Sequence, residues 1–304
     1  MFCYRTSIDV PILPFKNRIE GPREIMKQIV VIGDVHHHLW LAVEGLERIE
    51  AETGVAIDQV FSVGDLGLFL HEEDWRFLTG PSKYRKLEDS PKIREAWDRW
   101  RWPLSAIAGN HEPFHRLRNW DAAYFGNKLK YTDAGELGHE IPGLRAAGLS
   151  GIYNPAEAEF VSAIERANRK LPRAGSWPEM VAMAETNKIS RSRLTYYKEF
   201  EVDLLKLLAP RPDILLLHDW PVAPSRIKEV PGRRPEMEIV ESLQPAFVCC
   251  GHHHTSAAFV VGNTQVRALN IIGGRSHSIN PGWACIFDWE GSGLQNARFW
   301  PPIP

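Results

Sequence analysis

The chain has 304 residues, 44% of them hydrophobic and 24% charged, so it is long enough and apolar enough to fold around its own core. Its formal net charge of -2 excludes bulk electrostatic attraction to nucleic acid or to anionic membranes. No apolar run approaches the roughly 20 residues that cross a bilayer, and the N-terminus lacks the pattern of a secretory signal. The four cysteines have no metal-binding spacing, which favours reduced thiols in a cytoplasmic protein.

Strand and helix patterns alternate in the first third of the chain. Apolar, β-branched runs at 28–33, 59–64 and 104–109 predict strands that are buried on both faces of a sheet. Apolar residues recur at helical spacing in 39–49, after the first strand, and in 93–100, before the third. Strands and helices in this order predict a layered βαβ core.

The second half of the chain begins with a mostly helical region at 155–210 and returns to strands at 213–218 and 246–251. Three further apolar runs with short turns predict an antiparallel meander: 257–261, 264–272 and 283–289. Together these elements predict an α/β protein built as a sandwich of two mixed β-sheets with helices outside.

We expect one domain over residues 26–304, because no linker divides this range. Within it, residues 155–195 are predicted to be a helical insertion over the site. Residues 1–25 carry three prolines and little periodicity, and they are predicted to be a peripheral extension that ends just before the first core strand.

Five of the apolar runs end in a small polar cluster that includes metal-ligand residue types. In chain order the clusters are Gly33-Asp34-Val35-His36, Gly64-Asp65, Gly109-Asn110-His111-Glu112, His218-Asp219 and Gly251-His252-His253-His254. Any one cluster is explained as well by a helix cap or a satisfied polar residue, but five in order are not. Ligands at the carboxyl ends of neighbouring strands converge on one crevice. A mixed set of carboxylate, imidazole and amide groups suits manganese, iron or zinc.

This ordered set resembles the calcineurin-like metallophosphoesterases, whose signature is D-x-H, G-D, G-N-H-[DE], H and G-H-x-H. The resemblance runs from residue 28 to about 290. It implies a four-layer α/β/β/α sandwich and two divalent transition-metal ions, manganese first, with iron or zinc as alternatives. The implied ligands of one ion are Asp34, His36 and His254, those of the other are Asn110, His218 and His252, and Asp65 bridges the two.

The resemblance also implies a catalytic role for His111, which would contact the phosphate and stabilise its charge or protonate the leaving oxygen. A water that bridges the two ions would lose a proton near neutral pH and attack the phosphate ester. Glu112 and Asp219 are expected either to orient His111 and a ligand imidazole or to be surface carboxylates. The remaining histidines of the clusters match no ligand position: His37, His38 and His253.

Two segments are similar to a branch of this family, the RNA lariat debranching enzymes: G-L-S-G-I-Y at 148–153 and H-D-W-P at 218–221. A helix at 197–202 matches more loosely. The similarity implies that Tyr153 and Asn154 contact substrate. That branch typically has cysteine where this chain has Asp34, so Asp34 restores a full two-metal set.

Substrate class is left open between several alternatives. The leading hypothesis is a phosphodiesterase acting on nucleotides or on single-stranded or branched nucleic acid. A basic stretch from Lys83 to Arg101 is compatible with it if Trp97, Trp100 and Trp102 stack on unpaired bases, whereas an amphipathic helix would pack them inward. The alternatives are a phosphomonoesterase, such as a protein Ser/Thr phosphatase, and a binding module that kept the fold without catalysis. The sequence does not identify a protein partner.

Overall fold

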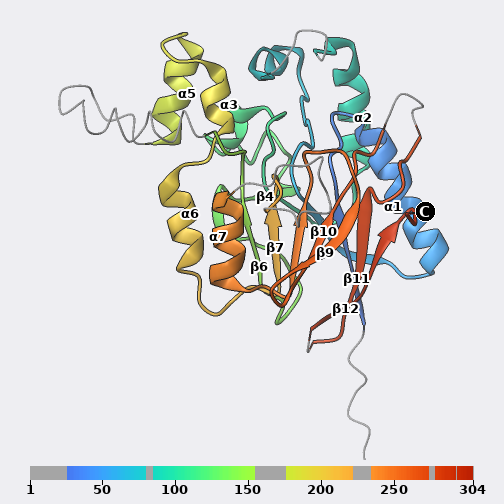
Figure 1. Cartoon of the computed structure of the whole chain (residues 1–304). Helices are drawn as coiled ribbons and strands as arrows, with labels where there is room; N and C mark the ends of the chain where they lie inside the picture. The colour runs from blue at the N-terminus through green and yellow to red at the C-terminus, as the bar shows by residue number, and fades with distance from the viewer. Residues whose placement is uncertain are drawn as a thin grey trace, which may run out of the picture.

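Two mixed β-sheets face each other in the computed structural model, which describes residues 26–79, 85–154, 176–221, 234–273, 278–291 and 293–303 (Figure 1). The first sheet contains, in spatial order, β12 (Leu294–Trp300), β11 (Ala284–Trp289), β1 (Lys27–Ile32), β2 (Ile57–Ser62), β3 (Leu104–Ala106) and β4 (Leu129–Tyr131). The second contains β5 (Ala134–Glu136), β6 (Ala146–Leu149), β7 (Ile214–Leu217), β8 (Phe247–Cys250), β10 (Thr264–Ala268) and β9 (Ala257–Val261). Strands β1 to β4 are parallel, as are β6, β7, β8 and β10, and the outer strands β5, β9, β11 and β12 run antiparallel to their neighbours.

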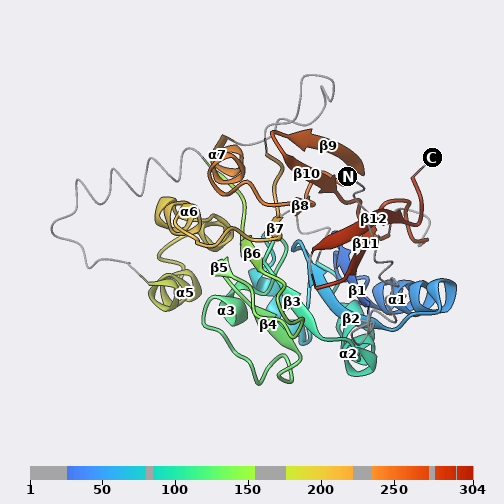
Figure 2. The ribbon, with the colours of Figure 1, turned by 90° about the horizontal axis from the view of Figure 1, so that it is seen from below.

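Helices cover the outer face of each sheet, which confirms the predicted four layers (Figures 1 and 2). Helices α1 (Leu39–Thr53) and α2 (Ser90–Arg99) lie on the first sheet, and α6 (Glu199–Lys206) and α7 (Arg234–Leu243) lie on the second. The shorter elements are α3 (Phe114–Leu117), α5 (Trp177–Glu185), η1 (Glu72–Phe77), η3 (Leu87–Asp89) and η4 (Arg191–Thr195).

Alternating side chains explain why the strand sequences are continuously apolar. In β1, Val30 and Ile32 pack with the helices, whereas Ile29 and Val31 pack in the layer between the sheets. In β7, Leu215 and Leu217 likewise face helices α6 and α7, and Leu216 faces the first sheet. Each central strand is therefore buried on both faces, as its sequence predicts.

The predicted C-terminal meander is wrong in its pairing. Strands β9 and β10 do form an antiparallel pair, but β11 crosses to the first sheet, where it pairs with β1 and β12. An apolar run indicates that a strand is buried and carries no information about its partner. Short strands β4, β5 and β6, together with the more polar β12, were not predicted.

The region between β6 and β7 is less helical than predicted over the residues that are described. The region predicted to be mostly helical is interrupted before α6: Leu194 lies in η4, and α6 begins only after Lys198, whose amide donates to the Glu201 carboxylate at 2.6 Å. Such a capping contact fixes a helix start. Residues 155–175 of the predicted insertion and the predicted extension 1–25 lie outside the described residues.

The three tryptophans of the basic stretch pack inward, so the base-stacking interpretation is wrong. Trp97, Trp100 and Trp102 are at most 4% exposed. The neighbouring cations Arg99 and Arg101 pair with glutamates of α1, with Arg101 2.5 Å from Glu50. Lys83 lies outside the described residues.

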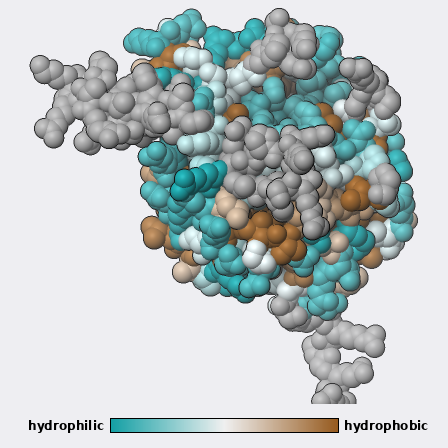
Figure 3. Space-filling view, viewed as in Figure 1, coloured by the Kyte–Doolittle hydropathy of each residue, from teal (hydrophilic) through white to brown (hydrophobic). Residues whose placement is uncertain are grey.

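Hydrophilic side chains cover most of the described surface on the face drawn in Figure 3, and the apolar ones lie in separate groups. Three exposed apolar side chains lie on α6 and just beyond it: Phe200, Leu204 and Leu207. Among the described residues, no helix has the length and apolarity to cross a membrane.

Candidate metal and catalytic site

Every predicted ligand stands just beyond the carboxyl end of a strand. The first sheet supplies Asp34 and His36 after β1, Asp65 after β2 and Asn110 after β3. The second sheet supplies His218 after β7 and two further histidines after β8, His252 and His254. The two sheets therefore meet at one edge of the sandwich with their ligand-bearing loops side by side.

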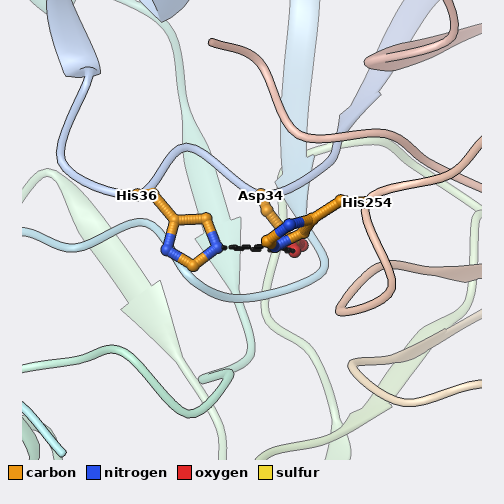
Figure 4. Close-up of side chains that lie close together, drawn as sticks. All are labelled: Asp34, His36 and His254. Carbon is orange, nitrogen blue, oxygen red and sulfur yellow. Dashed lines mark hydrogen bonds and ion pairs between the residues drawn. The ribbon is translucent and has the colours of Figure 1, made fainter. Parts of the chain in front are cut away.

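One group of donors gathers at Asp34 (Figure 4). Asp34 is fully buried, and its Oδ2 lies 3.2 Å from Nε2 of His254 and 3.8 Å from Nε2 of His36. The Nε2 atoms of these two histidines are 2.9 Å apart. One carboxylate and two imidazoles thus point their donor atoms at a common point.

A second group gathers at Asp65, with His218 and His252. Nδ1 of His218 lies 2.8 Å from the Val63 carbonyl and donates to it, so Nε2 of the neutral ring carries a lone pair. That Nε2 is 3.5 Å from Oδ2 of Asp65 and 3.3 Å from Oδ1 of Asn110. A carbonyl that fixes the tautomer in this way is the usual support of a metal-binding imidazole.

Asp65 lies between the two groups. Its Oδ1 accepts hydrogen bonds from the amides of Asn110 at 2.6 Å and His111 at 2.7 Å. Its Oδ2 is buried, has no hydrogen-bond partner among the described residues, and lies 3.4 Å from Nε2 of His36 on the other side. A buried carboxylate oxygen that faces two imidazole nitrogens fits a shared position between two cations.

The electrostatic environment of the site also favours the binding of cations. Burial alone would favour neutral acids, but the surrounding imidazoles hold the pKa of both Asp34 and Asp65 below its usual range. Burial opposes protonation of His218, yet Asp65 raises the pKa of His218 to about 10. Burial and the neighbouring His218 lower the pKa of His252 to about 4. Two buried carboxylates need positive charge nearby, and bound divalent ions would supply it.

Two glycines leave the space that these carboxylates occupy. A Cβ on Gly109 would lie 2.1 Å from Oδ1 of Asp65, and one on Gly251 would lie 2.2 Å from Oδ1 of Asp34. Five site residues adopt positive φ angles between 44° and 68°: His36, His37, Asp65, His252 and His254. Such backbone costs of order 1–3 kcal/mol per residue, and it is typical of functional sites.

Both neighbouring carboxylates, Glu112 and Asp219, are buried. Glu112 accepts hydrogen bonds from the amides of Leu66 at 2.9 Å and Gly67 at 3.0 Å, so it holds the loop after Asp65. Burial, together with the Asp65 charge, raises the pKa of Glu112 to about 8. Neither Glu112 nor Asp219 is a surface carboxylate.

Asp219 and His253 join the two loops of the second sheet. Oδ1 of buried Asp219 lies 3.0 Å from Nε2 of His253, and Nε1 of Trp220 donates to the Gly251 carbonyl at 2.8 Å. Sequence reasoning left His253 without a role, because spacing cannot reveal a contact between residues 34 positions apart. The other unmatched histidines, His37 and His38, stack on each other at 5.0 Å.

His111 and the two expected substrate residues stand at the same edge. The His111 ring lies 4.9 Å from that of His36, and burial lowers the pKa of His111. Tyr153 and Asn154 follow β6, the parallel neighbour of β7, and the Tyr153 ring stacks on Tyr197 at 5.9 Å. The geometry brings the seven proposed ligands and His111 together, whereas the contact given for Tyr153 is with Tyr197.

The sequence profile of the calcineurin-like phosphoesterases matches residues 27–256, which is most of the chain. The chain therefore belongs to the calcineurin-like phosphoesterase family, a family of hydrolases that act on phosphoester bonds and depend on metal ions.

Individual relatives of the chain carry a narrower name than the family does. The chain is 25% identical over 256 residues to the lariat debranching enzyme of Arabidopsis thaliana, a match that covers 77% of this chain and 56% of that enzyme. It is 24% identical over 269 residues to the lariat debranching enzyme of Entamoeba histolytica, covering 82% and 70%. The chain thus spans just over half the length of the plant enzyme. A solved structure from Thermus thermophilus aligns with a TM-score of 0.45 at 12% identity, covering 89% of this chain and 98% of that one.

Proposed function

We propose that the chain is a metal-dependent phosphodiesterase with two divalent ions at the shared edge of its sheets. The observation that carries this proposal is the buried Oδ2 of Asp65, which accepts no hydrogen bond from the described residues. It lies 3.4 Å from Nε2 of His36 in one donor group and 3.5 Å from Nε2 of His218 in the other. The proposed ligands of one ion are Asp34, His36 and His254, those of the other are Asn110, His218 and His252, and Asp65 serves both.

Two bound divalent ions would supply Lewis acidity, which neutralises phosphate charge and makes a water acidic enough to act as the nucleophile near neutral pH. The nitrogen and oxygen donors favour manganese first, with iron or zinc as alternatives. Asp65 holds the amides of Asn110 and His111, so the side chain of His111 is fixed beside His36. There it can donate a hydrogen bond to a phosphate oxygen or a proton to the leaving oxygen.

We further propose a nucleic-acid diester as the substrate, with branched or single-stranded RNA the preferred form. The support is the name shared by the relatives and the match of the 148–153 and 218–221 segments. Asp34 occupies the position at which that branch typically has cysteine, so a complete two-ion site is proposed here. Buried free thiols at Cys249, Cys250 and Cys285 support a reducing, cytoplasmic location.

The test compares substrates on protein loaded with manganese. We expect bis(4-nitrophenyl) phosphate to be cut faster than 4-nitrophenyl phosphate, and a branched RNA oligonucleotide to be cut at the branch. Because contacts along a strand release counterions, cleavage of the oligonucleotide should fall steeply with salt, whereas cleavage of the small diester should change little.

Two outcomes would contradict the proposal. Preferential hydrolysis of the monoester or of a phosphoprotein would favour a phosphomonoesterase. A protein that takes up no metal and cuts neither ester would be a binding module of the same fold.

A further inference from the structure

The loop formed by residues 150–154 lies at the same edge as the proposed ligands. It follows β6, whose last residue, Leu149, pairs with Leu217 of β7, and His218 comes directly after β7. On one side the amide of Gly151 donates to the carbonyl of Ala108 at 2.8 Å, two residues before Asn110. Since neighbouring parallel strands end at a common crevice, this loop forms one wall of the site.

The loop is fixed on two further sides. The amide of Ser150 donates to the Asp133 carbonyl at 2.7 Å, in the turn before β5. The amide of Ile152 donates to the Thr195 carbonyl at 3.0 Å, at the end of η4. Gly151 has a φ of +96°, and a Cβ there would lie 2.5 Å from the same Thr195 oxygen. The position of the 150–154 loop therefore depends on the distance between the turn at Asp133 and η4.

One buried side chain, Arg118, connects those two supports. Its guanidinium forms an ion pair with the Asp133 carboxylate through Nη1, and its Nε donates to the Leu194 carbonyl at 3.2 Å. Asp133 carries the oxygen that holds Ser150, and Leu194 precedes the residue that holds Ile152. The side chain of Arg118 is fully buried, so it cannot reach substrate itself.

Arg118 also anchors the helices that follow the loop. Its guanidinium carbon lies 3.6 Å from the ring centroid of Trp177 in α5, and Nη1 is 3.8 Å from Glu201 in α6. Nε1 of Trp177 donates to Glu201 at 3.2 Å and closes the group. A buried guanidinium that pairs with carboxylates and stacks on an aromatic ring has little freedom to move.

We propose that Arg118 is a positioning residue for substrate: it fixes the 150–154 loop against the part of a nucleic-acid substrate that extends beyond the cleaved diester. This inference rests on the proposed phosphodiesterase function. The loop carries Tyr153, whose ring is held against Tyr197 and offers an aromatic face of the kind on which unpaired bases stack. In its described contacts Arg118 meets none of the proposed metal ligands, so the chemistry at a small diester does not depend on it.

The test uses Arg118→Met, with Arg101→Met as the control at an exposed arginine that pairs with Glu47 and Glu50. Manganese content, kcat and KM are measured for bis(4-nitrophenyl) phosphate and for a single-stranded RNA oligonucleotide, together with hydrogen exchange of the peptide 148–154. We expect Arg118→Met to keep two manganese ions and to change kcat for the small diester less than about threefold. It should raise KM for the oligonucleotide at least tenfold and accelerate exchange in the peptide. The control, Arg101→Met, should change neither the KM for the oligonucleotide nor the exchange of the peptide.

The proposal would be overturned if Arg118→Met changed neither the KM for the oligonucleotide nor the exchange of the peptide. It would also be overturned if the variant lost activity equally on both substrates. Arg118→Met leaves the buried Glu201 carboxylate and the partly exposed Asp133 without this cation, so a second variant guards against a failure to fold. Arg118→Lys keeps the charge and loses the bond to Leu194, so it should give the same pattern with a smaller change in KM. If the wild-type protein cuts neither substrate, the proposed function fails, and the exchange of peptide 148–154 alone then decides whether Arg118 holds the loop.

Discussion

Gly109 shows how a missing side chain shapes the site. Its Cα stands so close to Asp65 and His218 that a methyl group would overlap both, at 2.1 Å and 2.5 Å. The sequence motif therefore reflects space for the carboxylate as well as a tight turn, which sequence inspection alone did not reveal. Gly138 offers a comparison, since a Cβ there would meet only the Lys130 side chain, at 3.6 Å.

We expect Gly109→Ala to displace Asp65 and to lower manganese binding at least tenfold, because both donor groups use this carboxylate. Gly138→Ala should bind manganese like the wild-type protein. Isothermal titration of manganese into each variant makes the comparison. Normal affinity in Gly109→Ala would mean that Asp65 is not shared between ions.

His111 and Asp65 should separate catalysis from metal binding. His111→Ala removes the proposed contact to phosphate and should retain two ions while losing roughly 10²–10⁴-fold in kcat, the range of general acid catalysis. Asp65→Ala should lose metal. Elemental analysis gives the metal content of each variant, and the diester assay gives its kcat. Equal loss of metal in both variants would contradict the division of roles.

Asp74, in η1, connects this element to α3. Its buried carboxylate accepts hydrogen bonds from the amide of His71 at 3.1 Å, from Tyr124 at 2.5 Å and from Arg116 at 3.3 Å, and it lies 2.8 Å from Nε2 of His115. Nearby, Thr79 donates to the Asn110 carbonyl at 2.8 Å, so the packing of these elements reaches a proposed ligand.

Asp74→Asn should lower the free energy of unfolding by about 3 kcal/mol, because it breaks a buried ionic group. Although burial favours the neutral acid, the bonds from His115 and Tyr124 hold the pKa of Asp74 below its ordinary value. A carboxylate of lowered pKa contributes stability above its unfolded pKa of about 3.9, and this contribution is lost as the pH falls through the folded pKa. Urea unfolding at pH 7 and pH 3 should therefore show a smaller acid effect in the variant. Asp121→Asn, at a more exposed partner of Arg116, should change stability by less than about 1 kcal/mol.

The long central strands and helices could be predicted from the sequence, because their burial produces a clear pattern of apolar residues. The sequence also predicted the edge at which the ligands meet. A residue such as Asp34, which follows a buried strand, lies at the carboxyl edge of the sheet. The sequence could not predict β11 beside β1, nor the contact of Asp219 with His253, because both depend on how distant segments pair. The ion pairs of Arg118 were missed for the same reason.

At the scale of the whole molecule, all the proposed metal ligands and His111 lie within residues 26–304, the range that we propose as the catalytic domain. A chain that starts at Met26 should fold, bind two manganese ions and keep at least half of the wild-type kcat, because β1 begins at Lys27 and every proposed ligand follows it. Circular dichroism, elemental analysis and the diester assay check this. Loss of folding or activity would mean that residues 1–25 contribute to the core or to the site.

The pairing of β1 with β11 has a consequence for synthesis. Residue Lys27 pairs with Trp289, so one edge of the first core strand finds its partner only after almost the entire chain has been made. On the ribosome, β1 can join β2 early, yet its other edge stays open and apolar until the segment around Ala284 emerges. Open strand edges invite association with other chains, and contacts of such long range form slowly. Nascent chains of this protein should therefore depend on chaperones through most of their translation and lose that dependence when β11 closes the sheet.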